Sequence, residues 1–187
     1  MNSNPGDEDL IAGCRQGEGD ACRVFFHRFK HDVAKIAYNL LGRCEGMEDV
    51  IQKIFLDVFS SLKKFRGDCK IQTWIYRIAA NVCADEIKTQ SRLRRLSREN
   101  FIHEYNQTFS NRTALDQLEV QELAERVDFL LQDIGAKKRV AFSLYVFGEK
   151  SIAEISEVLC VPPGTVKFRI FEARREIQAK LKEFERT

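Results

Sequence analysis

Proline is absent from 156 consecutive residues of this chain, from position 6 to position 161. Proline breaks helices because it lacks a backbone donor and its ring clashes with the preceding turn, so a long proline-free stretch favours helices. Apolar residues here recur at intervals of three and four, the period of one buried helical face, whereas the alternation typical of strands is hard to find. The chain is therefore predicted to be all-α.

Several apolar stripes follow this helical period, and glycines that are typical of helix ends come after them at 42, 135 and 148. The first three stripes are Val24, Phe25, Phe29, Val33, Ile36, Ala37 and Leu40; then Val50, Ile51, Ile54, Phe55, Val58, Phe59 and Leu62; then Trp74, Ile75, Ile78, Ala79, Val82 and Ile87. The later ones are Val120, Leu123, Val127, Leu130, Leu131 and Ile134, followed by Val140, Leu144 and Phe147.

The stripes fall into two groups. Between them, residues 93–118 are rich in Asn, Gln, Ser and Thr, which is a linker composition. The length of 187 residues allows two small domains. We therefore predict helical domains at 6–92 and 119–187, joined by a flexible linker at 93–118, with the second a four-helix domain of the helix-turn-helix kind. Inside the linker, the cluster from Phe101 to Phe109 could form a short docking segment.

The end of the chain carries the pattern of a helix-turn-helix. Ser151 and Glu154 have the spacing of a capping box, the segment Cys160–Gly164 interrupts the helix, and a basic helix restarts near Thr165. Its apolar side is Val166, Ile170, Ala173, Ile177 and Leu181. The first residues of such a helix can reach base edges in the major groove, which indicates DNA binding.

The formal net charge of only +2 conceals two basic segments. Residues 88–98 carry +5 and residues 165–182 carry +4, so the rest of the chain carries −7. This distribution excludes a uniformly basic binder and predicts two cationic surfaces on an acidic body.

Two features of the first domain have alternative interpretations. Trp74, which precedes the basic run and follows the polar loop 66–70, belongs either to a surface that stacks on exposed bases or to the core. Leu56 falls on the polar side of its stripe, as either the centre of a protein-binding patch or a single exposed leucine.

Other functional classes find little support. The six cysteines contain no Cys-x-x-Cys pair, so free thiols are expected, although Cys14 and Cys22 with His27 or His31 could form a metal or redox site. No apolar run is long enough for a membrane span, and the polar, acidic N-terminus is unlike a secretory signal. No nucleophile–base pattern indicates an enzyme, and no cofactor is expected.

Beyond these patterns, the chain resembles the extracytoplasmic-function group of bacterial RNA polymerase sigma factors over nearly its whole length. The matching blocks in the first half are EDVIQKIF at 48–55, FRGD at 65–68 and TWIYRIA at 73–79, with Asn81 and Asp85. Those in the second half are IAEI at 152–155 and PPGTVK at 162–167, continuing to Ala173 and Arg174.

The resemblance implies three functional surfaces. Core polymerase, through the clamp helices of its β′ subunit, would meet Asp49, Gln52, Lys53 and Leu56. The minus-10 promoter element would be recognised and melted by Arg66, Asp68, Lys70, Trp74, Arg77, Asn81, Asp85 and Lys88. The minus-35 element would be read by Thr165, Lys167, Phe168, Arg169, Glu172 and Arg174.

Four residues depart from the pattern of the group. Lys53 stands where an acid is common, and Phe168 where a small polar residue is usual. Glu172 replaces a frequent basic residue, and its carboxylate can accept a hydrogen bond from cytosine N4. Cys160 occupies a turn position where glycine is common, and a left-handed conformation there would cost about 1 kcal/mol.

The resemblance also implies the partners: core RNA polymerase through its β′ and β subunits, promoter DNA, and an anti-sigma factor. The free chain would be a cytoplasmic monomer without direct membrane insertion, held at the inner membrane face if its anti-sigma factor is membrane-bound. Two alternatives compete with this function: a conventional helix-turn-helix regulator, which would bind duplex DNA tightly without polymerase, and a thiol-based metal or redox sensor.

Overall fold

The computed structural model describes residues 6–42, 44, 46–100 and 130–184, which form α-helices and one short 3-10 helix, with no strand among them. The all-α prediction is confirmed. Residues 93–100 of the predicted linker are helical and continue the helix that starts at Ile71. From position 101 onward the predicted linker lies outside the described residues, as do the cluster Phe101–Phe109 and the stripe residues Val120, Leu123 and Val127. None of the helices in the described ranges has the length and apolarity to cross a membrane.

Helices α1 (Asp7–Gln16) and α2 (Gly19–Leu41) form an antiparallel pair joined by a tight turn. The turn uses Gly17 in the left-handed conformation at φ 83°, which glycine adopts without steric cost. The two helices approach closely at Gly13, where an added Cβ would stand 2.6 Å from the Cβ of Ala21. Glycine at this position therefore allows the contact.

The core of the first domain lies between α2, α3 (Met47–Ser61) and α4 (Ile71–Asn100), with the 3-10 helix η1 (Leu62–Lys64) following α3. The first three predicted stripes supply it. Phe25, Val33, Ile54, Val58 and Ile75 are completely or almost completely buried. Phenylalanine rings interlock at the contact of α2 with α3, where the centroids of Phe26 and Phe55 are 4.6 Å apart.

The second domain contains α6 (Ala136–Val146), α7 (Ile152–Leu159) and α8 (Pro163–Phe184). Leu144, Ile155 and Val166 are buried where these helices meet. The last residues of the two stripes predicted for α6 and α8 are not buried. Phe147 and Leu181 are 38% and 44% exposed, since they lie at or near the ends of their helices.

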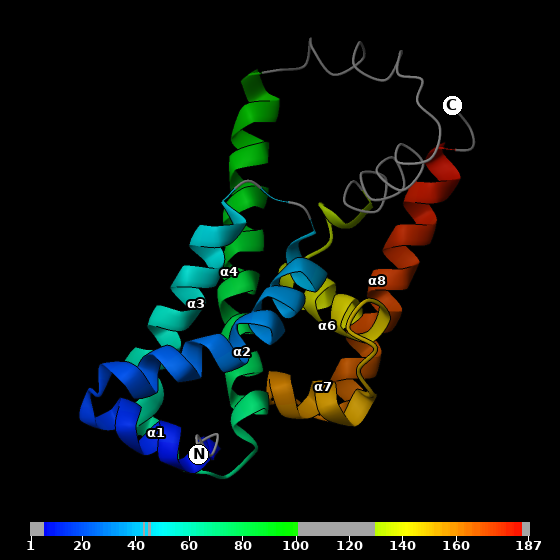
Figure 1. Cartoon of the computed structure of the whole chain (residues 1–187). Helices are drawn as coiled ribbons and strands as arrows, with labels where there is room; N and C mark the ends of the chain where they lie inside the picture. The colour runs from blue at the N-terminus through cyan, green and yellow to red at the C-terminus, as the bar shows by residue number, and fades with distance from the viewer. Residues whose placement is uncertain (1–5, 43, 45, 101–129, 185–187) are drawn as a thin grey trace, which may run out of the picture.

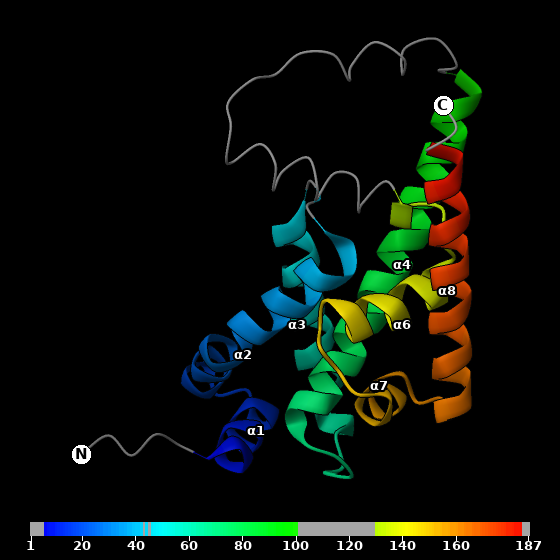
Figure 2. The same cartoon turned by 90° about the vertical axis from the view of Figure 1, so that its right-hand side faces the viewer.

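The two domains share one hydrophobic core. Helices α6 and α7 contact α4 on one side and α8 on the other, and α6 also contacts α2 (Figure 1). In the perpendicular view, α1, α2 and α3 lie toward one side of the molecule and α8 toward the other (Figure 2). Val140, Leu144 and Ile155 belong to the same buried cluster as the residues of α2, α3 and α4.

A buried arginine connects the two domains by hydrogen bonds. Arg139 of α6 is only 3% exposed, and its guanidinium donates to the carbonyl oxygens of Leu40 at 3.3 Å and Leu41 at 3.0 Å. These carbonyls belong to the last turn of α2, where helices leave acceptors without internal donors and carry partial negative charge. Arg139 therefore both satisfies the end of α2 and joins the domains.

Candidate protein-binding and nucleic-acid interfaces

The four residues predicted to meet core polymerase lie together on the outer face of α3. Asp49, Gln52, Lys53 and Leu56 are all exposed and follow the spacing of one helical face. Leu56 is 61% exposed, while Ile54 and Val58 on the opposite face are completely buried. The helix thus presents an aliphatic side chain surrounded by polar ones, which we call the α3 patch.

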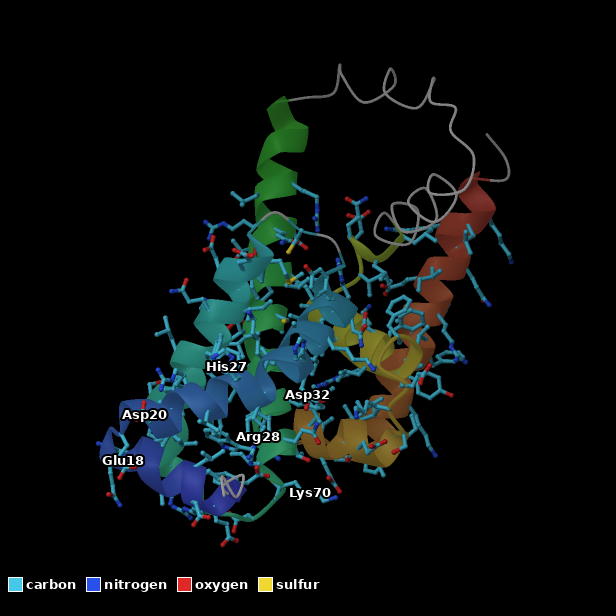
Figure 3. All side chains as sticks on the ribbon, viewed as in Figure 1. Glu18, Asp20, His27, Arg28, Asp32 and Lys70 are labelled. Atoms are coloured by element: carbon cyan, nitrogen blue, oxygen red, sulfur yellow. The ribbon has the colours of Figure 1, made fainter. Side chains whose placement is uncertain are left out.

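The predicted minus-10 residues divide between the loop before α4 and one face of that helix. Arg66, Asp68 and Lys70 are exposed in the loop, where Figure 3 labels Lys70. Arg15 of α1 holds the base of this loop by donating to the carbonyls of Leu62, at 3.2 Å, and Phe65. Sequence reasoning missed Arg15, because its partners are about 50 positions away along the chain.

On α4, Trp74, Arg77, Asn81, Asp85 and Lys88 recur every three or four residues, which places them along one side of the helix, the α4 face. Asn81, Asp85 and Lys88 are exposed. Asp85 and Lys88 form a surface ion pair at 2.7 Å, which contributes little to stability but offsets the charge of each.

Trp74 combines the two interpretations left open by the sequence. Its ring is half-buried and tilts against Phe65, with centroids 5.3 Å apart. The indole is therefore anchored at the edge of the loop and keeps part of its surface in solvent.

Arg77 is engaged by the second domain. Its guanidinium donates to the carbonyl oxygen of Glu157 in the last turns of α7, at 3.0 Å, while its Nε is buried with no hydrogen-bond partner among the described residues. Beside Arg77 in the sequence, the ring centre of Tyr76 lies 5.2 Å from the Lys150 ammonium. Burial raises the pKa of Tyr76, and the nearby Asp32 carboxylate on α2, labelled in Figure 3, raises it further.

The predicted helix-turn-helix is present in α7 and α8. Ser151 Oγ accepts from the amide of Glu154 at 3.2 Å, and the Glu154 carboxylate accepts from the amide of Ser151 at 2.8 Å, which is the predicted capping box. The Glu154 carboxylate also accepts from the hydroxyl of Ser151 at 2.7 Å, and the two hydrogen bonds that it accepts lower the pKa of Glu154, the backbone one most. Cys160 adopts the left-handed conformation at φ 51° and ψ 45°, the strained geometry anticipated from the sequence.

The start of α8 presents most of the predicted minus-35 residues to solvent. Lys167, Phe168 and Arg174 are exposed, and Thr165 and Arg169 are half-buried. Arg174 lies 5.4 Å from the ring centre of Tyr145 on α6. Glu172 is paired with Arg175 at 2.8 Å, so its carboxylate is already partly neutralised.

Sequence reasoning did not single out Phe171, although this side chain is 63% exposed beside Phe168 on the same helix. The signal was available, since Phe171 does not fall in the helical stripe that contains Val166, Ile170 and Ala173.

The alternative metal site is not formed. No group of three or more His, Cys, Asp or Glu side chains in the described ranges is arranged to hold a metal ion, and these ranges include Cys14, Cys22, His27 and His31. Burial raises the pKa of the Cys14 thiol to about 12, helped by its neighbour Cys22, and burial raises that of Cys83 to about 12. Such thiols are protonated and unreactive at neutral pH.

Known proteins match both halves of this architecture. The family model for Sigma-70 region 2 matches residues 25–93, and the model for Sigma-70, region 4 matches residues 124–177. The ECF RNA polymerase sigma-E factor of Haemophilus influenzae is 28% identical over 182 residues, covering 94% of this chain and 95% of that protein. The chain belongs to the ECF sigma factors.

Further proteins are similar to this sigma factor over most of its length. The ECF RNA polymerase sigma-E factor of Escherichia coli K12 is 28% identical over 188 residues, covering 97% of both chains. A solved structure of CnrH in complex with the cytosolic domain of CnrY matches with a TM-score of 0.60 and 21% identity, covering 95% of this chain and 97% of that one. The sigma factor RpoE of Bartonella quintana, solved with the anti-sigma factor NepR, matches with a TM-score of 0.54 and 19% identity, covering 86% and 96%.

In this sigma factor the region 2 match contains the α3 patch and the described α4 face, and the region 4 match contains the helix-turn-helix. The roles of the individual residues on these surfaces stay predictions.

Proposed function

We propose that this chain is an alternative sigma factor that binds core RNA polymerase and directs initiation at promoters with defined minus-10 and minus-35 elements. The observation that supports this most strongly is the presence, on one chain and in the family order, of the exposed α3 patch and an exposed basic helix in a helix-turn-helix. The chain performs no covalent chemistry in this role. It acts in the cytoplasm, where core polymerase is found.

Binding energy in this mechanism comes from several weak sources. Cations such as Lys167 and Arg169 release counterions from DNA phosphates, which makes the affinity salt-dependent. The Trp74 edge and the loop 66–70 favour strand opening by holding an unstacked base, whose extrusion costs a few kcal/mol. Polymerase holds both domains on one promoter, so two weak contacts act at high effective concentration.

An anti-sigma factor is the proposed regulator. The support is that both solved relatives named above were captured in complexes, one with an anti-sigma factor. In this proposal the inhibitor covers the surfaces used by polymerase, including the α3 patch.

The deciding experiment is in vitro transcription with core polymerase over a library of genomic fragments, combined with gel filtration. The chain should co-elute with core polymerase and produce discrete start sites that share upstream elements. Tight binding to duplex DNA without polymerase, together with no co-elution, would instead identify a conventional helix-turn-helix regulator.

Two double variants separate the surfaces. Gln52→Ala with Leu56→Ala should weaken core binding by at least about tenfold, since truncating the centre of a protein interface commonly costs 1.4 kcal/mol or more. Lys167→Ala with Arg169→Ala should spare core binding and reduce promoter use and its salt dependence. The exposed Lys63→Ala serves as the control for both, and equal losses in the two double variants would mean that the surfaces are misassigned.

A further inference from the structure

The outer face of α8 carries two aromatic side chains that the described part of the chain leaves largely uncovered. Phe168 and Phe171 are 62% and 63% exposed, more than any other large apolar side chain whose exposure the structure describes. Leaving two phenylalanine rings in water is unfavourable, so an exposed pair on one helix indicates a surface that becomes covered by a partner.

Their positions on the helix are those of a groove-reading surface. Val166, Ile170 and Ala173 define the buried side of α8. At about 100° per residue, Phe168 points almost opposite that side, and Phe171 lies about 60° from Phe168. Both belong to the first three turns of α8, and it is the first part of a recognition helix that contacts base edges.

The charges around the pair favour a polyanion as that partner. Lys167, Arg174 and Arg175 are exposed on the same helix, and Arg169 is half-buried beside them. Glu172, which follows Phe171 in the sequence, is paired with Arg175 at 2.8 Å, and this offsets its repulsion toward phosphate. An apolar centre surrounded by cations matches a DNA major groove, where phosphates border the base edges.

We propose that Phe168 and Phe171 read thymine in the upstream promoter element through its C5-methyl group. This inference rests on the proposed function. The thymine methyl is the apolar feature of the major-groove edge, and phenylalanine is one of the side chains able to contact it. Neither ring can donate or accept hydrogen bonds with the other base edges, so the pair selects for methyl-bearing positions and against cytosine.

The experiment replaces thymine by deoxyuridine, which keeps Watson–Crick pairing and removes only the methyl. Holoenzyme made with core polymerase first selects a promoter from duplexes with a randomised upstream element. The selected duplex is then synthesised with either thymine or deoxyuridine in that element, and holoenzyme affinity is measured for both. The wild type should lose about fourfold for each contacted methyl, the equivalent of about 0.8 kcal/mol for burial of one such group.

The variants Phe168→Ala and Phe171→Ala assign the contacts. Each should lower affinity for thymine DNA and remove its share of the discrimination, with little effect on folding because both rings are exposed. Leu181→Ala is the matched control, since it truncates an exposed apolar residue of α8 near its other end and should keep the full discrimination.

Equal affinity of the wild type for thymine and deoxyuridine DNA would overturn the proposal, and so would full discrimination in both phenylalanine variants. Variants that bind both DNAs as the wild type does, but lose binding to a protein partner, would assign the pair to a protein interface instead. If holoenzyme selects no promoter at all, the proposed function itself fails, which is a distinct result.

Discussion

The second domain has two faces on which apolar and basic side chains have opposite environments. Its inner face, against α2 and α4, buries aliphatic side chains such as Leu144 and Ile155. Its outer face, on α8, leaves Phe168 and Phe171 more than 60% exposed. Apolar surface is thus used for cohesion on one face and kept available on the other.

Cations follow the same division. On the inner face, Arg139 donates to the last carbonyls of α2 and Arg77 reaches from α4 to the last turns of α7, so positive charge satisfies the negative ends of helices. On the outer face, Lys167 and Arg174 are exposed. The number of cations in a helix is therefore a poor indicator of whether the helix binds DNA. The side of the helix on which each cation lies is a better one.

The largest effect is expected from breaking the inner face at Arg139. Arg139→Met should lower the free energy of unfolding by about 3 kcal/mol, because the buried carbonyls of Leu40 and Leu41 lose their donor and each unsatisfied group costs about 1–3 kcal/mol. Chemical denaturation followed by circular dichroism measures the loss. Lys137→Met, an exposed cation of the same helix, should change it by less than about 0.5 kcal/mol, and equal losses would refute the special role of Arg139.

The shared core should also respond to alkaline pH through Cys83. Its pKa is raised from 9.0 to about 12 by burial, so the unfolded chain releases this proton first. The contribution of the protonated Cys83 thiol to the free energy of unfolding is therefore fully present below pH 9. It is lost between pH 9 and pH 12, by up to about 1.4 kcal/mol per pH unit. Denaturation midpoints across this range should fall less steeply in Cys83→Ala. An unchanged slope in that variant would contradict the assignment.

A smaller effect is expected at the turn between α7 and α8. Cys160→Gly should stabilise the protein by about 1 kcal/mol, since Cys160 holds a left-handed conformation that glycine adopts without a steric penalty. Thermal unfolding measures the gain. Cys160→Ala keeps the penalty and should give no gain, so stabilisation by both substitutions would point to the thiol instead of the backbone.

The smallest effect is expected on the outer face. Phe168→Ala with Phe171→Ala should change the free energy of unfolding by no more than about 0.5 kcal/mol, because both rings are largely in solvent. Ile170→Ala, which lies between them and is 6% exposed, should cost about 2 kcal/mol or more in the same assay. A large loss in the phenylalanine variant would mean that the rings pack within the fold.

The sequence predicted most of what depends on neighbours along the chain. Apolar periodicity located the described helices from α2 onward but predicted no helix over Asp7–Gln16, which forms α1. The Ser151–Glu154 spacing predicted the capping box, and the family pattern marked Cys160 as a strained turn residue. These features depend on residues within one or two turns of each other, so a pattern along the chain suffices to find them.

What the sequence did not predict depends on distant partners. Arg139 looks like one of three consecutive cations from 137 to 139, and its partners lie 98 and 99 positions away. Arg77 has the position of a DNA contact in the family pattern, and only the packing of α7 shows where its guanidinium lies in the free chain. Long-range contacts of this kind leave no local periodicity.

The packing of α7 over Arg77 has a consequence for measured affinities. Since Arg77 is a proposed DNA contact and is bonded to Glu157 in this arrangement, only molecules in which the two domains have parted offer the full α4 face. The apparent dissociation constant of the isolated chain is its intrinsic value divided by the fraction of such molecules. We therefore expect the affinity of the α4 face for DNA to be underestimated when the protein is assayed alone, by a factor that any partner holding the domains apart removes.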